Sequence, residues 1–245
     1  TSMKRRLLGN VASLVMVQFA NYVLPFLTLV YLTDTIGLEL YGILAYAQGI
    51  ITLSILFIDF GYDLSATNRI SKNRHRKKYI GKLMGGIFAV KIILFLICFI
   101  AIFLYYYFDK KYINYNNIFL LSLFPIAVQS FTPLWFYHGT ERLKYFAAIS
   151  IASKLIIFIF LVAFIEGPDD YYFVPVFNGI GQSLLLIASF IYIHQLGFKI
   201  YRPDAKTIIF CLKFTKNFFV SRVAVAEYMS SGVIILGLIA KTAAI

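Results

Sequence analysis

The sequence predicts an all-α integral membrane protein built as a polytopic helix bundle, and two observations support this prediction. Hydrophobic residues make up 60% of the 245 residues and charged residues only 14%, with a mean hydropathy of +0.80. Apolar runs of about 20 residues, enough helix to cross a bilayer core of about 30 Å, recur along the chain. We expect about seven transmembrane helices, at Leu7–Leu32, Tyr41–Phe60, Leu83–Phe108, Ile118–Tyr137, Ala147–Ile165, Tyr172–Leu196 and Phe218–Ala240.

The first predicted helix follows three basic residues, as a signal peptide does, but its apolar run is about twice as long as a signal core. We therefore expect it to be retained. Its polar residues Gln18, Asn21 and Thr28 and its proline Pro25 recur at three- and four-residue spacing, so they share one face. That face is expected to look inward, either as hydrogen-bonding packing or as the lining of a transport cavity.

The net charge of +12 is distributed by loop. Basic residues dominate before the first span and after the second, fourth and sixth, whereas the other loops carry acidic residues such as Asp34, Glu39, Glu166, Asp169 and Asp170. This alternation predicts a cytoplasmic N-terminus by the positive-inside rule, and it favours contact with anionic lipid over binding of nucleic acid. The basic cluster from Arg69 to Lys82 is expected to be the loop after the second span.

Three cations, Lys91, Lys154 and Arg222, lie inside predicted spans, toward the cytoplasmic side. A charge in hydrocarbon costs about 2.5 to 3.5 kcal/mol on insertion scales, so such residues usually face a cavity or a partner. They either line a cavity for an anionic cargo or are satisfied by snorkelling and ion pairing. The intramembrane carboxylates Asp59 and Glu227 are candidates for that pairing, or for coupling to H⁺ or Na⁺.

The fourth predicted span contains Pro125, Gln129, Pro133 and Trp135, and two prolines eight residues apart predict a bent or broken helix. Such helices often border a substrate path in transporters. Gly81 and Gly85, at the start of the third span, are expected to allow close helix packing.

No enzyme signature and no cluster of metal ligands is evident, so neither a catalytic residue, a metal site nor a bound cofactor is predicted. The two cysteines, Cys98 and Cys211, are placed in a membrane span and in a cytoplasmic loop, which makes a disulfide between them improbable.

Five segments carry a family resemblance: QFANYVLPFLTLVYLT (18–33), LYGILAYAQGI (40–50), DFGYDLSATNRIS (59–71), PLWFYHGTERLKY (133–145) and FFVSRVAVAEYMSSGVIILG (218–237). In this order they resemble the Wzx-type polysaccharide flippases of the MOP exporter superfamily, which handle O-antigen and similar repeat units.

The resemblance implies a bacterial inner membrane transporter that moves undecaprenyl-pyrophosphate-linked oligosaccharide between two six-helix lobes with a cationic lumen. It implies membrane lipid as a partner, together with polysaccharide polymerase and chain-length proteins. It also implies a cytoplasmic signature at Asp59, Gly61, Ser65, Ala66, Thr67, Arg69, Trp135, Gly139 and Glu141, and it matches Arg222 to the basic residue of the seventh helix.

The chain departs from that family pattern at Asp34 and Asp63, and it supplies about seven of the twelve or more helices expected. Residues 1–216 would form the first lobe and residues 217–245 the first helix of a second lobe. The alternatives are a related multidrug or cation antiporter, a membrane polysaccharide polymerase or glycosyltransferase, and an inactive truncated fragment. The antiporter would be expected to have an acidic lumen, because its cargo is cationic. The enzymes would be expected to have a larger outer loop that carries catalytic residues.

Overall fold

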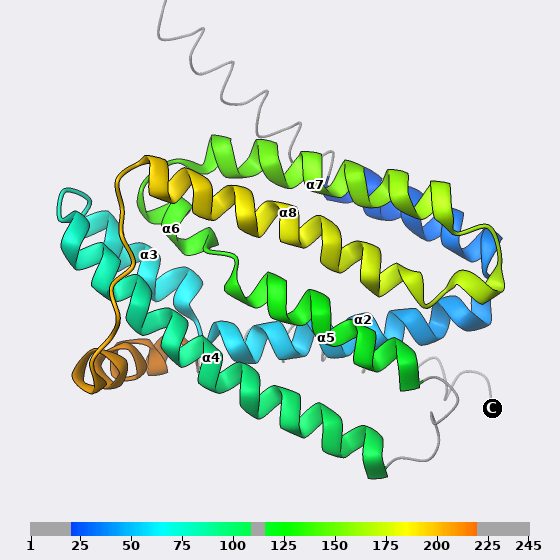
Figure 1. Cartoon of the computed structure of the whole chain (residues 1–245), viewed down its shortest axis with the longest axis horizontal. Coiled ribbons are helices and arrows are strands. Elements are labelled where there is room, and N and C mark those ends of the chain that lie inside the picture. Colours follow the sequence, from blue (N-terminus) through cyan, green and yellow to red (C-terminus); the bar gives the residue numbers. More distant parts are fainter. Residues whose placement is uncertain (1–20, 109–115, 220–245) are drawn as a thin grey trace, which may run out of the picture.

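The computed structural model describes residues 21–108 and 116–219, which form a bundle of α-helices (Figure 1). Five helical stretches within this part of the chain are long and apolar enough to cross a membrane. They are Leu38–Lys72, Lys77–Leu104, Ile118–Gly139, Leu143–Phe164 and Phe173–Gln195. The prediction of an all-α, polytopic membrane bundle is therefore confirmed. The described part of the first predicted span is a helix over residues 21–35, and the seventh span lies almost wholly outside the described residues.

Helix α2 (Leu38–Asp59) is followed almost at once by a second helix, α3 (Tyr62–Lys72). The joint between them contains two residues with left-handed backbone, Phe60 at φ 49° and Gly61 at φ 81°. Glycine adopts this conformation without steric cost. A Cβ at Gly61 would also lie 3.0 Å from the backbone nitrogen of Phe219. The joint thus depends on a glycine both for its backbone and for its packing.

The basic stretch from Arg69 to Lys82 is mostly helical, so its prediction as a loop is wrong. Only residues 73–76 separate α3 from α4 (Lys77–Phe108). Across α3 and the start of α4, buried residues stand four apart in two pairs, Ala66 and Ile70 on α3 and Ile80 and Met84 on α4. This spacing gives each helix an apolar stripe that packs into the core, while the basic side chains occupy the other faces.

The fourth predicted span is broken into α5 (Asn116–Phe131) and α6 (Leu134–Gly139), as its two prolines predict. Pro125 lies within α5, and Pro133 lies at the break. The amide of Leu134 donates to the carbonyl of Thr132, at 3.0 Å, rather than to Ser130 four residues earlier. The break therefore leaves the carbonyl oxygen of Ser130 without its regular helical donor.

Two more long helices, α7 (Leu143–Phe164) and α8 (Phe173–Gln195), follow, with a short 3₁₀ turn (η2, Pro168–Asp170) before α8. Helix α8 packs against both α5 and α7, and α2 packs against α5 (Figure 1). A Cβ at Gly181 of α8 would lie 2.1 Å from the side chain of Ile157 of α7, so this contact depends on a glycine. A further helix covers residues 205–219.

Gly81 and Gly85 permit a close approach, but to a non-helical segment rather than to another helix. A Cβ at either position would lie 1.9 Å from a backbone oxygen, that of Lys199 or Tyr201. The amide of Tyr201 also donates to the carbonyl of Gly81, at 3.2 Å. The segment over residues 198–204, which connects α8 to the helix of residues 205–219, is therefore held directly on the backbone of α4.

The two ends of the bundle differ in charge. We call one the basic end; there α3 and α8 end, α4 and α7 begin, and the helix of residues 205–219 lies (Figure 1). At the opposite end, which we call the acidic end, the helix of residues 21–35 and α7 end and α2 and α8 begin (Figure 1). The segments there contain Asp34, Glu39, Glu166, Asp169 and Asp170. The alternation of charge along the sequence is therefore a separation of charge between two ends.

Candidate functional site

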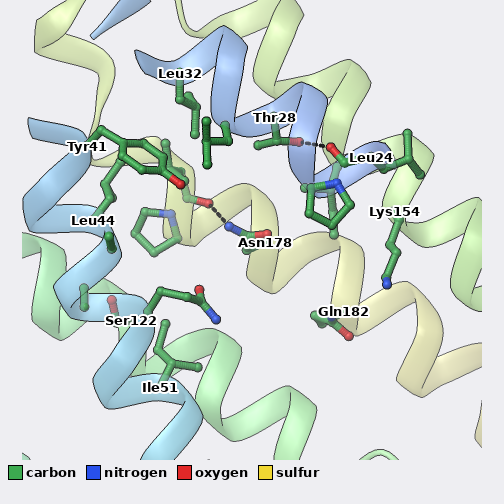
Figure 2. Close-up of a pocket in the computed structure, with 18 residues that line it drawn as sticks. Leu24, Thr28, Leu32, Tyr41, Leu44, Ile51, Ser122, Lys154, Asn178 and Gln182 are labelled. Atoms are coloured by element: carbon green, nitrogen blue, oxygen red, sulfur yellow. Dashed lines mark hydrogen bonds between the residues drawn. The ribbon is translucent and has the colours of Figure 1, made fainter. Parts of the chain in front are cut away.

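A cavity of about 460 Å³ lies among the helix of residues 21–35 and helices α2, α5, α7 and α8 (Figure 2). Its α8 residues, such as Asn178 and Gln182, belong to the first turns of that helix, which begins at the acidic end. Lys154 lies at the middle of α7. The cavity therefore extends from the middle of the bundle toward the acidic end.

Polar side chains from four of these helices face the cavity. They are Thr28, Gln48, Ser122, Asn178 and Gln182. Thr28 donates to the carbonyl of Leu24 at 2.9 Å and Asn178 to that of Val174 at 3.0 Å, each one turn earlier on its own helix (Figure 2). The side-chain amides of Gln48 and Gln182 have no hydrogen-bond partner among the described residues. These amides can bind hydroxyl or phosphate oxygens of a guest.

Lys154 supplies the positive charge of this cavity. Its ammonium group is partly buried and donates to the side-chain oxygen of Asn21 at 2.5 Å. Among the described residues that line the cavity, none carries a carboxylate that would neutralise it. An ammonium group at the middle of a membrane-spanning helix, held by a neutral amide, can bind an anion, because an anionic ligand would supply a countercharge.

Asn21, Pro25 and Thr28 come together here as the helical spacing predicts. Pro25 and Thr28 line the cavity, and Asn21 orients Lys154. In the structure, this face of the helix therefore points into the bundle. Gln18, which is predicted to continue the face, lies outside the described residues, as do Arg222 and Glu227.

Lys91 does not line the cavity; it forms an ion pair with Asp59. The ammonium nitrogen lies 3.0 Å from a carboxylate oxygen of Asp59, and the two side chains are 2% and 9% exposed. It also donates to the carbonyl of Ser130 at 2.9 Å, the oxygen freed by the break between α5 and α6. Lys91 therefore joins α2, α4 and α5. Of the two expectations for this residue, lining a cavity or forming an ion pair, the structure shows the ion pair.

Most residues of the cytoplasmic signature make contacts between elements at the basic end. The hydroxyl of Ser65 lies 3.1 Å from that of Thr215, and the Arg69 guanidinium lies 4.2 Å from the ring centre of Phe214. Because Thr215 and Phe214 belong to the helix of residues 205–219, both contacts fasten that helix to α3. Ala66 is fully buried in the same region.

A second group of signature residues joins the α3–α4 turn to α6. The Glu141 carboxylate accepts a hydrogen bond from Arg74 at 2.6 Å, and Arg74 also donates to the carbonyl of Gly139. Thr67 donates to the carbonyl of Trp135 at 3.2 Å. A Cβ at Gly139 would lie 2.6 Å from Ile70, so the glycine lets α6 approach α3.

Gln129 and Trp135, both predicted to face the lumen, lie away from the cavity. Gln129 is exposed on α5. Trp135 is fully buried in the core, with its ring centre 5.8 Å from that of Phe88. Their predicted contact with substrate stays a prediction.

The sequence reasoning missed four polar residues that line the cavity, Gln48, Ser122, Asn178 and Gln182. The pair on α8 carried a usable signal, because polar residues four apart in an apolar helix share one face. Gln48 and Ser122 carried a weaker signal, because each is the one Ser, Thr, Asn or Gln that its helix contributes to the described cavity lining.

These features define a class of protein: a multi-pass α-helical membrane protein with a polar, positively charged cavity among its helices. Comparison with known proteins then places the chain within that class. The sequence profile of the family described as "Polysaccharide biosynthesis protein" matches residues 7–245, so the chain belongs to that family.

Two curated relatives resemble the chain over nearly all of its length. One, from Escherichia coli (strain K12), is 29% identical over 241 residues, 96% of this chain and 57% of the relative. The other, from Shigella dysenteriae, is 26% identical over 233 residues, 93% of this chain and 57% of the relative. Each carries the name "Putative O-antigen transporter". The chain therefore spans little more than half the length of these relatives, and no solved structure matches it.

The comparisons confirm the resemblance to polysaccharide flippases, since both relatives are named as transporters of O-antigen and neither as an enzyme. They do not test the predicted domain boundary after residue 216. The described helix of residues 205–219 runs across that position.

Proposed function

We propose that this chain forms the first lobe of a transporter that flips polyprenyl-pyrophosphate-linked oligosaccharide across the bacterial inner membrane by alternating access. The carrying observation is Lys154, an ammonium group at the middle of α7 in a cavity whose other polar lining residues, within the described part of the chain, are neutral. The family match and the names of the relatives support this proposal. The proposal also places the basic end in the cytoplasm, and it requires a second lobe to enclose the cavity from the other side.

In this proposal the pyrophosphate binds at Lys154 while the sugar hydroxyl groups contact the amides of Gln48, Asn178 and Gln182. Charge-assisted hydrogen bonds to phosphate are about twice as strong as neutral ones. The bilayer midplane is where alternating-access transporters place their substrate sites. The polyprenyl tail stays in lipid, so the cavity needs to enclose only the polar part of the cargo.

The charge of the cavity favours this cargo over a cationic drug. Lys154 would repel a cation, and no described lining residue offers a carboxylate to bind one. A multidrug antiporter is therefore the weaker proposal.

The decisive experiment replaces Lys154 in a bacterium that depends on this protein for its surface polysaccharide. Loss of one charge-assisted hydrogen bond costs about 1.5 to 3 kcal/mol, so Lys154→Gln should lower glycan export roughly tenfold or more. Lys154→Arg keeps the charge and should retain most export. Lys213→Gln, an equal charge change on an exposed residue, is the matched control. Normal surface glycan in Lys154→Gln cells, at unchanged protein level, would overturn the role of Lys154.

The driving force in this proposal is a gradient of H⁺ or Na⁺ rather than a bound cofactor. Collapsing each gradient separately with a selective ionophore, and following surface glycan, would identify the coupled ion. Export that persists without either gradient would contradict this part of the proposal.

A further inference from the structure

A second hollow lies on the outside of the bundle, at its basic end. It has a volume of about 710 Å³ and is formed by the last turns of α8 and the segment that follows. Its walls are mainly apolar, with Phe190, Ile191, Phe198 and Ile200 among the lining side chains. A hollow of this size falls in the range of about 300 to 1,000 Å³ that is typical of sites for small ligands.

The position of this groove brings it to the edge of the bilayer. Helix α8 is one of the five membrane-spanning stretches, and the groove begins in its last turns and continues past its end at Gln195. Ile191 is 52% exposed and Ile200 46% exposed, so apolar groups stay uncovered within the described structure. Because the groove begins within a membrane-spanning stretch, its exposed apolar side chains can contact acyl chains.

Positive charge borders the apolar walls. Lys199 and His194 are exposed lining residues, and none of the lining residues that the structure describes is acidic. Lys77, at the start of α4, places its ammonium nitrogen 5.5 Å from the ring centre of Phe198 and donates to the carbonyl of Leu196 at 2.8 Å. Lys199 therefore lies at the edge of the groove, and Lys77, which is not a lining residue, contacts the ring of the lining residue Phe198.

We propose that this groove binds an anionic phospholipid from the leaflet that meets the basic end. One acyl chain would lie along the exposed side chains of Ile191 and Ile200, and the phosphate would pair with Lys199, with Lys77 adding positive charge beside Phe198. A basic residue near a membrane surface contributes roughly 1 kcal/mol of attraction to anionic lipid. The site is separate from the cavity at Lys154 and does not depend on the proposed transport activity.

The test measures lipid bound to the purified, full chain in detergent by native mass spectrometry. Phosphatidylglycerol should bind more strongly than zwitterionic phosphatidylethanolamine with the same acyl chains. Lys199→Gln should weaken the binding of phosphatidylglycerol about fivefold, which corresponds to roughly 1 kcal/mol. Lys206→Gln removes the same charge from an exposed residue on the helix of residues 205–219, and it should leave binding unchanged.

Two further arms examine the apolar wall. Ile191→Trp should fill the groove from its half-exposed edge and reduce lipid binding without lowering the unfolding temperature. Soluble glycerol phosphate, which carries the phosphate without acyl chains, should not compete. Equal losses in Lys199→Gln and Lys206→Gln, equal binding of both lipids, or full competition by glycerol phosphate would each overturn the proposal. Export of surface glycan is measured separately, so a failed lipid site is distinguishable from a failed transporter.

Discussion

Asp59 shows how one residue connects several helices. Its carboxylate pairs with Lys91, and it also accepts the amide of Asp63 near the start of α3, at 3.4 Å. Gly61, the N-terminal cap of α3, has no side chain to do this. A carboxylate near a helix N-terminus is stabilised by the unpaired amides there. The resemblance to flippases marked Asp59 for its sequence motif, and the structure gives it this structural role.

Removing Asp59 alone should be costly, because it leaves the Lys91 ammonium buried without its ion partner. Breaking a buried ion pair in this way costs about 3 to 5 kcal/mol, whereas replacing both partners by apolar residues is often nearly neutral. We therefore expect Asp59→Leu to lower the unfolding temperature strongly and Asp59→Leu with Lys91→Met to recover much of it. The measurement is thermal unfolding of the purified protein in detergent.

The exposed pair of Arg74 and Glu141 provides the control, since its side chains are 36% and 69% exposed. Exposed ion pairs contribute about 0 to 1 kcal/mol, so Glu141→Gln should change the unfolding temperature little. A double variant no more stable than Asp59→Leu would contradict the assignment of Lys91 to structure.

Cys211 should resist thiol reagents in the folded protein. Its side chain is fully buried beside Gly86, and this burial raises the pKa of the thiol to about 12. An ordinary thiol has a pKa of about 8.5, so only a very small fraction of Cys211 is the reactive thiolate at pH 7.5. Maleimide labelling at that pH should therefore be slow until denaturant is added. A cysteine introduced at the exposed Lys213 should be labelled at once, and rapid labelling of native Cys211 would contradict the packing of this helix.

At the scale of elements, the contact between α4 and residues 198–204 depends on the absence of a side chain at Gly81. A Cβ there would lie 1.9 Å from the Lys199 carbonyl, so Gly81→Ala should force the segment away and cost about 1 to 3 kcal/mol. Gly49, in α2, has nothing within 4 Å of the same position, and Gly49→Ala should stabilise by up to about 1 kcal/mol. Opposite shifts in unfolding temperature are expected, and a neutral Gly81→Ala would contradict the close approach.

The elements that sequence reasoning predicted well are those set by local pattern. Long apolar runs predicted the positions of the membrane-spanning helices, and Pro133 predicted the break between α5 and α6. The helical parts of the basic stretch were not predicted, because its many charged residues indicated a loop. The apolar residues that stand four apart, Ala66 and Ile70 and then Ile80 and Met84, indicated helices instead.

Contacts between distant segments could not be predicted in this way. Lys91 has its partner 32 residues away, and Lys154 has Asn21 133 residues away. Helical spacing predicted the face that Asn21 occupies, but not that α7 would lie against it. Which of the two lysines is paired and which faces a cavity therefore depends on helix packing, which a single sequence does not specify.

At the scale of the whole molecule, separated charge and the polar cavity together predict an orientation. Basic residues near membrane-spanning helices stay on the cytoplasmic side, so the basic end should be cytoplasmic and the acidic end should face outward. The cavity would then occupy the outer half of the membrane, with Lys154 at its inner limit. This arrangement fits a transporter lobe in which cargo reaches mid-membrane from one side and leaves by the other.

Single cysteines at the two ends test this orientation. In intact spheroplasts, a membrane-impermeant maleimide should label Asp169→Cys, at the acidic end, but should label Lys78→Cys, at the basic end, only after lysis. The native cysteines should give little background, because Cys211 is buried and Cys98 lies within a membrane span. Labelling of Lys78→Cys in intact spheroplasts would place the basic end outside. The cavity would then lie in the inner half of the membrane, and Lys154 would meet its cargo at the end of the cavity farthest from the cytoplasm.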